Sequence, residues 1–128
     1  MLDVHIDDFY KDCATILLLG FRFFPRQQTL FIEDISGPDD RDEFGLHSPR
    51  HLAAFGTAQW LKDEGYVRFS VADGYQSVDE FVLTAKAFSR LIRRQDATSR
   101  LIDHLEYTRL QSDSLQLEAL ISESFLQF

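Results

Sequence analysis

Apolar residues recur every three or four positions near the start of the chain, which predicts an amphipathic helix over residues 4–19. The apolar stripe includes Phe9, Cys13 and Ile16. Gly20 follows the last of these positions, and because glycine lacks a side chain and favours helix ends, we expect the helix to stop there.

The next segment alternates, and residues 29–35 are predicted to form a short strand or extended stretch. Residues 36–47 are polar and rich in Gly, Pro and Asp, which predicts a loop. Ser48 is a preferred N-cap, and Pro49 at the first helical position loses no hydrogen bond. We therefore expect a helix from this point to Gly65, which suits the position just after a helix end.

Two further alternating segments, residues 66–71 and 78–83, predict a β-hairpin with the turn dipeptide Asp73-Gly74 between them. Thr84 can cap a following helix that extends to about residue 94. The remaining pattern predicts helices over 100–110 and 115–128, as two helices or as one helix kinked near 112–114.

A helix that ends in a glycine, followed by a hairpin and a Thr-capped helix, occupies the passage from Trp60 to Phe88. The residues that carry this pattern are Gly65, Tyr66, Val67, Thr84 and Lys86. The passage resembles winged-helix domains of bacterial repressors of the PadR and MarR type. Ala87 stands where those proteins usually have Gly, and the acidic segment before Ser48 predicts no regular second helix of a helix-turn-helix.

The resemblance implies an α+β, mostly helical fold with a winged-helix-like core of helix, short strand, helix, β-hairpin wing and helix. We expect this core over residues 1–95, with a C-terminal helical extension over 96–128 in the same compact unit. Two segments, Phe24-Pro25-Arg26 through Gly37-Pro38-Asp39-Asp40 and Ser48-Pro49-Arg50-His51, are also similar to uncharacterised small bacterial proteins. That similarity implies no mechanism.

Composition favours a single globular domain, since the 128 residues are 45% hydrophobic and 27% charged. No apolar run approaches the roughly 20 residues that span a bilayer, and the first residues are acidic where an export signal would be basic. Cys13 is the single cysteine, which fits a reducing compartment. These features predict a soluble, cytoplasmic protein with no membrane association.

The formal net charge of −8 disfavours nucleic acid as a partner, because a surface that binds phosphates needs cations. A DNA-binding transcriptional regulator remains an alternative function. For that alternative the candidate nucleic-acid contacts are Arg50, Gln59, Lys62, Arg68, Arg90, Arg93 and Arg94. We favour a solvated helix face for the basic group near residues 86–100.

The C-terminal segment is unusually apolar and predicts a contact with a partner, which favours a non-enzymatic regulatory or adaptor module acting through protein–protein contact. A homodimer is the favoured form, and packing on the first helix is the alternative. The candidate contacts are Leu105, Leu117, Leu120, Ile121, Phe125 and Phe128.

An acidic run in the predicted loop suggests a third function, an acidic inhibitor or immunity-type protein that binds a basic partner. The candidate residues are Asp39, Asp40, Asp42 and Glu43. Their spacing does not match a calcium-binding loop, which needs alternating oxygen ligands and a glycine at the sixth position.

The chain offers little catalytic chemistry. His47 and His51 have the spacing of metal ligands on a helix, but no third ligand is evident beside them, so we predict no metal site. Cys13 is expected to be buried and inert. Nucleophile elbows and phosphate-binding glycine loops are absent from the sequence, and we expect no enzyme and no cofactor.

Overall fold

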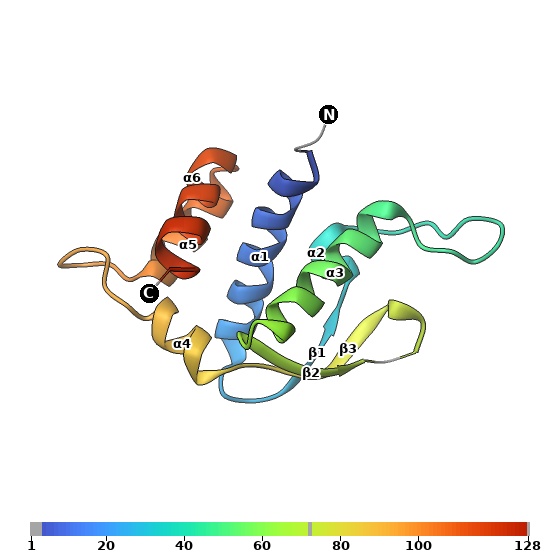
Figure 1. The fold of residues 1–128 in the computed structure, drawn as a ribbon, viewed down its shortest axis with the longest axis horizontal. Helices are drawn as coiled ribbons and strands as arrows, with labels where there is room; N and C mark the ends of the chain where they lie inside the picture. Colours follow the sequence, from blue (N-terminus) through green and yellow to red (C-terminus); the bar gives the residue numbers. More distant parts are fainter. Residues whose placement is uncertain (1–3, 72, 128) are drawn as a thin grey trace.

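The computed structural model describes residues 4–71 and 73–127 and has an α+β architecture (Figure 1). Helices pack around a small antiparallel sheet, as the apolar pattern predicted. The regular elements are α1 (Val4–Phe23), β1 (Gln28–Phe31), α2 (Glu33–Ser36), α3 (Pro49–Asp63), β2 (Val67–Val71), β3 (Ser77–Leu83), α4 (Ala85–Leu91), α5 (Leu101–Leu110) and α6 (Ser114–Ala119).

The sheet has the strand order β1-β3-β2, with β3 antiparallel to both neighbours. Val67 lies opposite Leu83 in the hairpin, and Leu30 lies opposite Val78 across the other edge of β3. Helices α1 and α3 lie over the same side of this sheet (Figure 1). The predicted hairpin is therefore confirmed, and its central strand also pairs with the strand that follows the first helix.

The prediction that Gly20 ends the first helix is wrong, because α1 continues to Phe23. Gly20 lies where α1 crosses the sheet, and a Cβ atom there would be 2.7 Å from the Cδ2 of Leu83 and 3.2 Å from the Cε2 of Phe81. The glycine therefore permits a close approach of helix and strand and does not terminate the helix.

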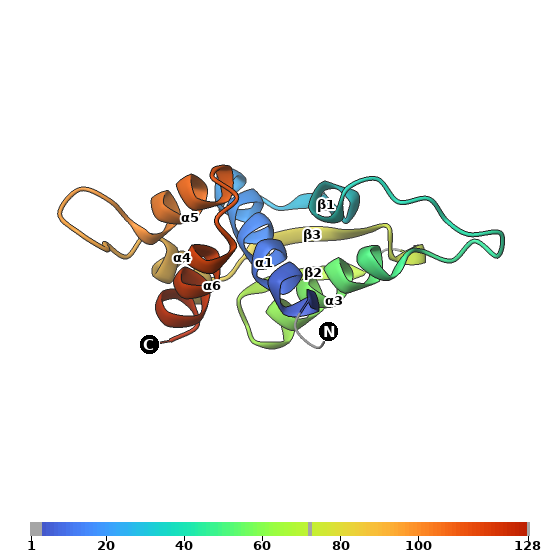
Figure 2. The same cartoon turned by 90° about the horizontal axis from the view of Figure 1, so that it is seen from above.

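The predicted strand over 29–35 is wrong at its end, since β1 stops at Phe31 and Glu33–Ser36 form a short helix. Gly37 follows with a φ of 90°, a backbone conformation that favours glycine and ends this turn. The loop expected after it is confirmed, and Figures 1 and 2 show it extending from one end of the molecule before it returns to α3.

Both predicted caps are confirmed by hydrogen bonds. The Ser48 hydroxyl accepts from the His51 amide at 3.2 Å at the start of α3, and the Thr84 hydroxyl accepts from the Ala87 amide at 3.4 Å at the start of α4. Helix α4 ends at Leu91, earlier than the expected residue 94. Polar side chains therefore fix where both helices begin.

The C-terminal segment packs against the opposite side of α1 from α3 (Figures 1 and 2). It consists of α5, α6 and a π-helical turn over Leu120–Phe125. The buried residues include Leu105, Leu117, Leu120, Ile121 and Phe125. Their prediction as partner or dimer contacts is wrong, because the chain itself covers them. Phe128 lies outside the described residues.

The turn at residues 111–113 separates α5 from α6, so the segment forms two elements and not one kinked helix. Within the described residues, no helix combines the length and the apolar content needed to cross a bilayer.

Candidate functional site

The solvent-facing side of helix α3 is uncharged over its first three turns. Its inner face buries Ala54, Phe55 and other apolar side chains, whereas Leu52 is 48% exposed and Gly56 has no neighbouring atom within 4 Å of a Cβ built on it. The solvent-facing residues of this helix recur at spacings of three and four, and those in its first three turns are Pro49, Leu52, Ala53, Gly56 and Gln59. We call these five residues the α3 face. None of them carries a charge, and the exposed residues that follow them in the last turn are the charged Lys62 and Asp63.

The cation at the start of α3 is engaged within the fold. Arg50 donates to both carboxylate oxygens of Asp12 on α1, at 2.8 and 2.5 Å, and the Asp12 side chain is only 2% exposed. A bidentate pair of this kind fixes both position and orientation. Arg50 therefore serves to dock α3 on α1, and its predicted role as a nucleic-acid contact would have to compete with this pair.

The other predicted nucleic-acid contacts come from separate elements. Gln59 and Lys62 are exposed on α3, and the Lys62 ammonium lies 4.9 Å from the centre of the Phe69 ring. Arg68 is exposed on β2. Arg93 and Arg94 lie beyond the end of α4.

Arg90 is a core residue, so its prediction as a nucleic-acid contact is wrong. It is 4% exposed and donates to the hydroxyl of Tyr66 and to the carbonyl oxygen of Phe125, both at 2.7 Å. Its guanidinium also lies 5.2 Å from the centre of the Tyr66 ring. These bonds join α4, the start of the hairpin and the C-terminal turn.

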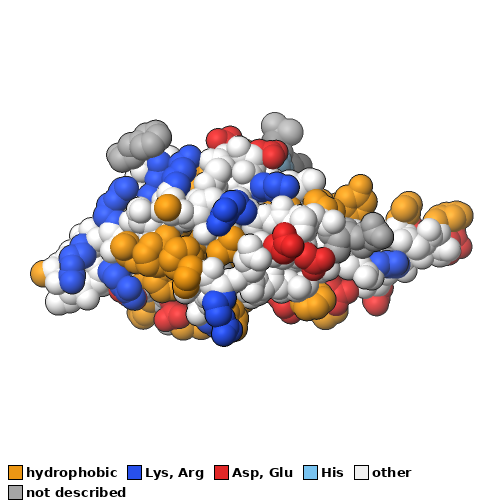
Figure 3. Space-filling view, turned by 90° about the horizontal axis from the view of Figure 1, so that it is seen from below, with side chains coloured by type: hydrophobic (Ala, Val, Ile, Leu, Met, Phe, Trp, Pro, Cys, Tyr) orange, Lys and Arg blue, Asp and Glu red, His pale blue; other side chains and the backbone are white. Residues whose placement is uncertain are grey.

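Aromatic side chains and cations gather at the α4 end of the molecule. Phe88 stacks on Phe24 with ring centres 4.2 Å apart, and Arg26 and Arg100 lie over the rings of Phe23 and Phe21. Figure 3 shows apolar side chains surrounded by Lys and Arg side chains at this end. We call this surface the aromatic–basic patch. Positive charge is therefore concentrated here although the chain as a whole is acidic.

The loop before α3 presents apolar side chains as well as acids. Asp42 folds the tip by accepting from the amides of Phe44 and Leu46, both at 2.9 Å, and these two apolar residues are 78% and 62% exposed. Asp40 and Glu43 are exposed, as the prediction of an acidic partner loop requires. We call residues 40–46 the loop tip.

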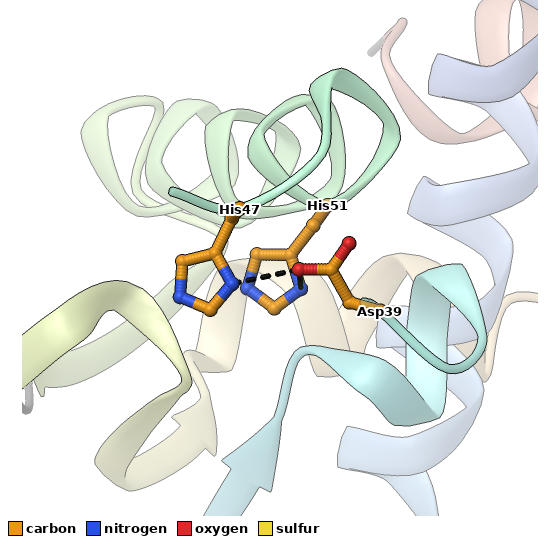
Figure 4. Close-up of side chains that lie close together, drawn as sticks. All are labelled: Asp39, His47 and His51. Atoms are coloured by element: carbon orange, nitrogen blue, oxygen red, sulfur yellow. Dashed lines mark hydrogen bonds and ion pairs between the residues drawn. The ribbon is translucent and has the colours of Figure 1, made fainter. Parts of the chain in front are cut away.

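Asp39 does not belong to this exposed set, and its prediction as a partner contact is wrong. Its side chain is 2% exposed and turns inward toward His47 and His51. The His47 Nδ1 lies 2.7 Å from the Asp39 Oδ2, and the His51 Nδ1 lies 3.5 Å from the same oxygen. Figure 4 shows the two imidazole rings side by side with the carboxylate next to them. Sequence spacing paired the histidines but missed the carboxylate that completes the cluster.

Two segments hold this cluster in place. Ser48 donates its amide hydrogen to the Asp39 Oδ1 at 3.2 Å, and the histidine rings stack with centres 4.0 Å apart. Hydrogen bonding by Ser48, and then by His47, lowers the pKa of Asp39 to about 2, although burial opposes this shift. Asp39 is therefore an ionised carboxylate directed at two imidazoles.

Comparison of this chain with models of protein families, with curated proteins and with solved structures found no match. Its function is therefore inferred from its own side chains.

Proposed function

We propose that this protein is a non-enzymatic regulatory or adaptor module that binds a protein partner on a winged-helix scaffold. The order helix, strand, helix and hairpin supports the scaffold, and so does the pairing of β1 with the inner strand of the hairpin. Helix α3 then corresponds to the helix that DNA-binding relatives of this architecture place in the major groove.

The uncharged α3 face is the observation on which the proposal rests. A helix that enters a DNA groove needs cations and polar side chains for phosphates and base edges. Here Leu52, Ala53 and Gly56 occupy the outward positions of the first turns, and the nearby Arg50 is bound to Asp12. The exposed cation Lys62 lies only in the last turn. A small, neutral and partly apolar face suits the centre of a protein interface, which is depleted of charge.

The loop tip extends this surface beyond the start of α3. Phe44 and Leu46 add exposed apolar area, and Asp40 and Glu43 place negative charge next to it. The partner expected from this chemistry has an apolar centre flanked by cations. An inhibitor or immunity-type protein would bind a basic target through the same loop. The adaptor hypothesis and the inhibitor hypothesis therefore expect a partner of the same chemistry.

Cross-linking in the native host, followed by affinity measurement with the captured partner, tests the proposal. Leu52→Glu and Phe44→Asp are expected to weaken binding at least about tenfold, because each places a charge in the contact. Leu115→Glu is the matched control, since Leu115 is 79% exposed on α6, away from α3. Equal affinity of all three variants would contradict the proposed surface.

Nucleic acid is the second candidate partner, and the aromatic–basic patch favours it. Aromatic rings and cations together can stack bases and neutralise phosphates. Binding to mixed-sequence single-stranded and duplex DNA should then fall steeply with salt and weaken in Arg26→Glu, within the patch, but not in Leu52→Glu. That result would favour the nucleic-acid function over the protein-binding function.

A further inference from the structure

The side chains of Asp39, His47 and His51 are largely buried and bring three possible ligand atoms close together. The side chains are 2%, 8% and 1% exposed, respectively. One ligand atom from each residue lies within 4.8 Å of the other two. They come from the loop before α3, from the residue preceding its cap and from its first turn. Polar atoms brought together in a largely buried site need hydrogen-bond partners or ligands.

The outer nitrogens of both rings face backbone carbonyls at the tip of the hairpin. The His47 Nε2 lies 2.7 Å from the Gly74 oxygen, and the His51 Nε2 lies 2.8 Å from the Tyr75 oxygen. A carbonyl oxygen only accepts hydrogen bonds, so each Nε2 carries a hydrogen and donates it. In the neutral rings the lone pairs are therefore on the Nδ1 atoms. Metal-binding histidines are oriented in the same way, by an outer nitrogen that donates to a carbonyl or carboxylate.

The inner nitrogens and the carboxylate share one unsatisfied position. The His51 Nδ1 is buried and has no hydrogen-bond partner among the described residues. Asp39 Oδ1 is already bonded to Ser48, which leaves Oδ2 directed at the two Nδ1 atoms. A proton between Oδ2 and His47 would satisfy one nitrogen and leave the other unpaired. A metal cation among the three atoms satisfies all of them.

We propose that His47 Nδ1, His51 Nδ1 and Asp39 Oδ2 bind a divalent transition-metal ion of the zinc class. Two imidazoles and a carboxylate form a donor set that zinc accepts, with water or another group in the fourth position. Metal–ligand bonds of about 2.0–2.1 Å place tetrahedral ligands about 3.3 Å apart. The observed separations from Oδ2 are 2.7 and 3.5 Å and lie on either side of this value. The two rings stack with planes 6° apart, so at least one of them must rotate for both Nδ1 lone pairs to point at one ion.

The donor set also determines which ions are excluded. Calcium and magnesium prefer six or more oxygen ligands, and this site offers one carboxylate oxygen beside two nitrogens. The bound ion would hold the loop before α3 against the helix start, while the Nε2 bonds tie both to the hairpin tip. The bound ion would therefore fix the base of the loop tip, and this effect does not depend on the identity of the partner.

Isothermal titration of chelator-treated protein with ZnCl₂ tests the proposal, and Co²⁺ replaces Zn²⁺ for absorption spectroscopy. One equivalent of Zn²⁺ per chain is expected, and the Co²⁺ complex should show the visible bands of a four-coordinate site with nitrogen ligands. Asp39→Asn and His47→Gln should each weaken Zn²⁺ binding at least about tenfold. In the wild type, the imidazole nitrogen NMR signals of His47 and His51 should report coordination through Nδ1.

His104→Gln is the matched control, because His104 also lies near a carboxylate, 3.5 Å from Asp96, but outside the cluster. It should bind Zn²⁺ as the wild type does. The proposal is overturned if the wild type binds less than one equivalent at about 100 µM Zn²⁺, a concentration about a hundredfold above a micromolar Kd. It is also overturned if His104→Gln loses binding as Asp39→Asn does. The Co²⁺ spectrum and the NMR signals use the wild type, so a variant that fails to fold does not remove the test. No partner is needed, so this result is separate from that of the proposed function.

Discussion

The close approach of α1 to the sheet predicts opposite effects for two glycine substitutions. Gly20 and Gly56 both lie inside helices, so replacement by alanine should favour each helix by about 1 kcal/mol. At Gly56 nothing lies within 4 Å of the new Cβ, and this gain is expected in full. At Gly20 the new Cβ would lie 2.7 Å from the Cδ2 and 2.9 Å from the Cγ of Leu83.

Leu83 cannot yield freely, because it is 1% exposed in the core and lies on the central strand. Adding a methyl group to a packed core costs about 1–3 kcal/mol. The net effect of Gly20→Ala is therefore a loss of about 1 kcal/mol, after the helix term is subtracted. The two variants should differ by about 1–3 kcal/mol, which corresponds to several degrees in Tm, at about 4 °C per kcal/mol.

Urea unfolding followed by circular dichroism and by the fluorescence of the single tryptophan, Trp60, measures both free energies of unfolding. The m-value should be unchanged, since neither substitution alters the surface exposed on unfolding. Equal stabilisation by Gly20→Ala and Gly56→Ala would refute the contact between α1 and Leu83.

Three further outcomes follow from buried or hydrogen-bonded polar groups. Burial raises the pKa of the Cys13 thiol, so thiol reagents should label the native protein only as fast as it unfolds and should label it rapidly in denaturant. Arg90→Met should lower the free energy of unfolding by about 3 kcal/mol, because it leaves buried acceptors without a charged donor, whereas the exposed Arg93→Met should change it by less than about 0.5 kcal/mol. Hydrogen bonds from Thr98, and then from Ser99, lower the pKa of Asp96. The ionised Asp96 therefore stabilises the fold at pH values above its unfolded pKa, and this stabilisation is lost as the pH falls through its folded pKa. Carboxyl NMR titration should show the low pKa of Asp96, and Asp96→Asn should remove its share of the acid dependence of stability.

Local signals predicted the parts of the fold that depend on neighbouring residues. Ser48 and Thr84 cap α3 and α4 as expected, because a hydroxyl reaches an amide three residues further along. The hairpin follows from alternation and a turn dipeptide. Gly20 was misassigned because the reason for glycine there is Leu83, on a strand far along the chain, and no local pattern reveals that contact.

The histidine cluster shows the same limit in a site. Spacing placed His47 and His51 near each other. Asp39 lies beside them only because the loop between residues 39 and 47 extends away from the rest of the molecule and then returns (Figure 2). A loop whose two ends meet brings its first and last residues together. The sequence does show an acid near the beginning of the predicted loop and a histidine at its end. Their proximity could be predicted only by assuming that the two ends of the loop lie side by side.

The burial of the C-terminal helices changes where a partner can bind. Residues 12–17 of α1 are all buried, and in a helix six consecutive positions point in every direction around the axis. Such a helix needs cover on all sides, and α3 with the sheet supplies only one of them. The buried apolar residues of the C-terminal segment are that missing cover, so the fold itself accounts for them. Exposed apolar side chains remain at the α3 face and the loop tip, in Leu52, Phe44 and Leu46, and also on α5 and α6, in Tyr107, Leu110 and Leu115. Because exposed apolar area of this kind is typical of contact surfaces, these positions, and not the buried ones, are the candidates for a partner.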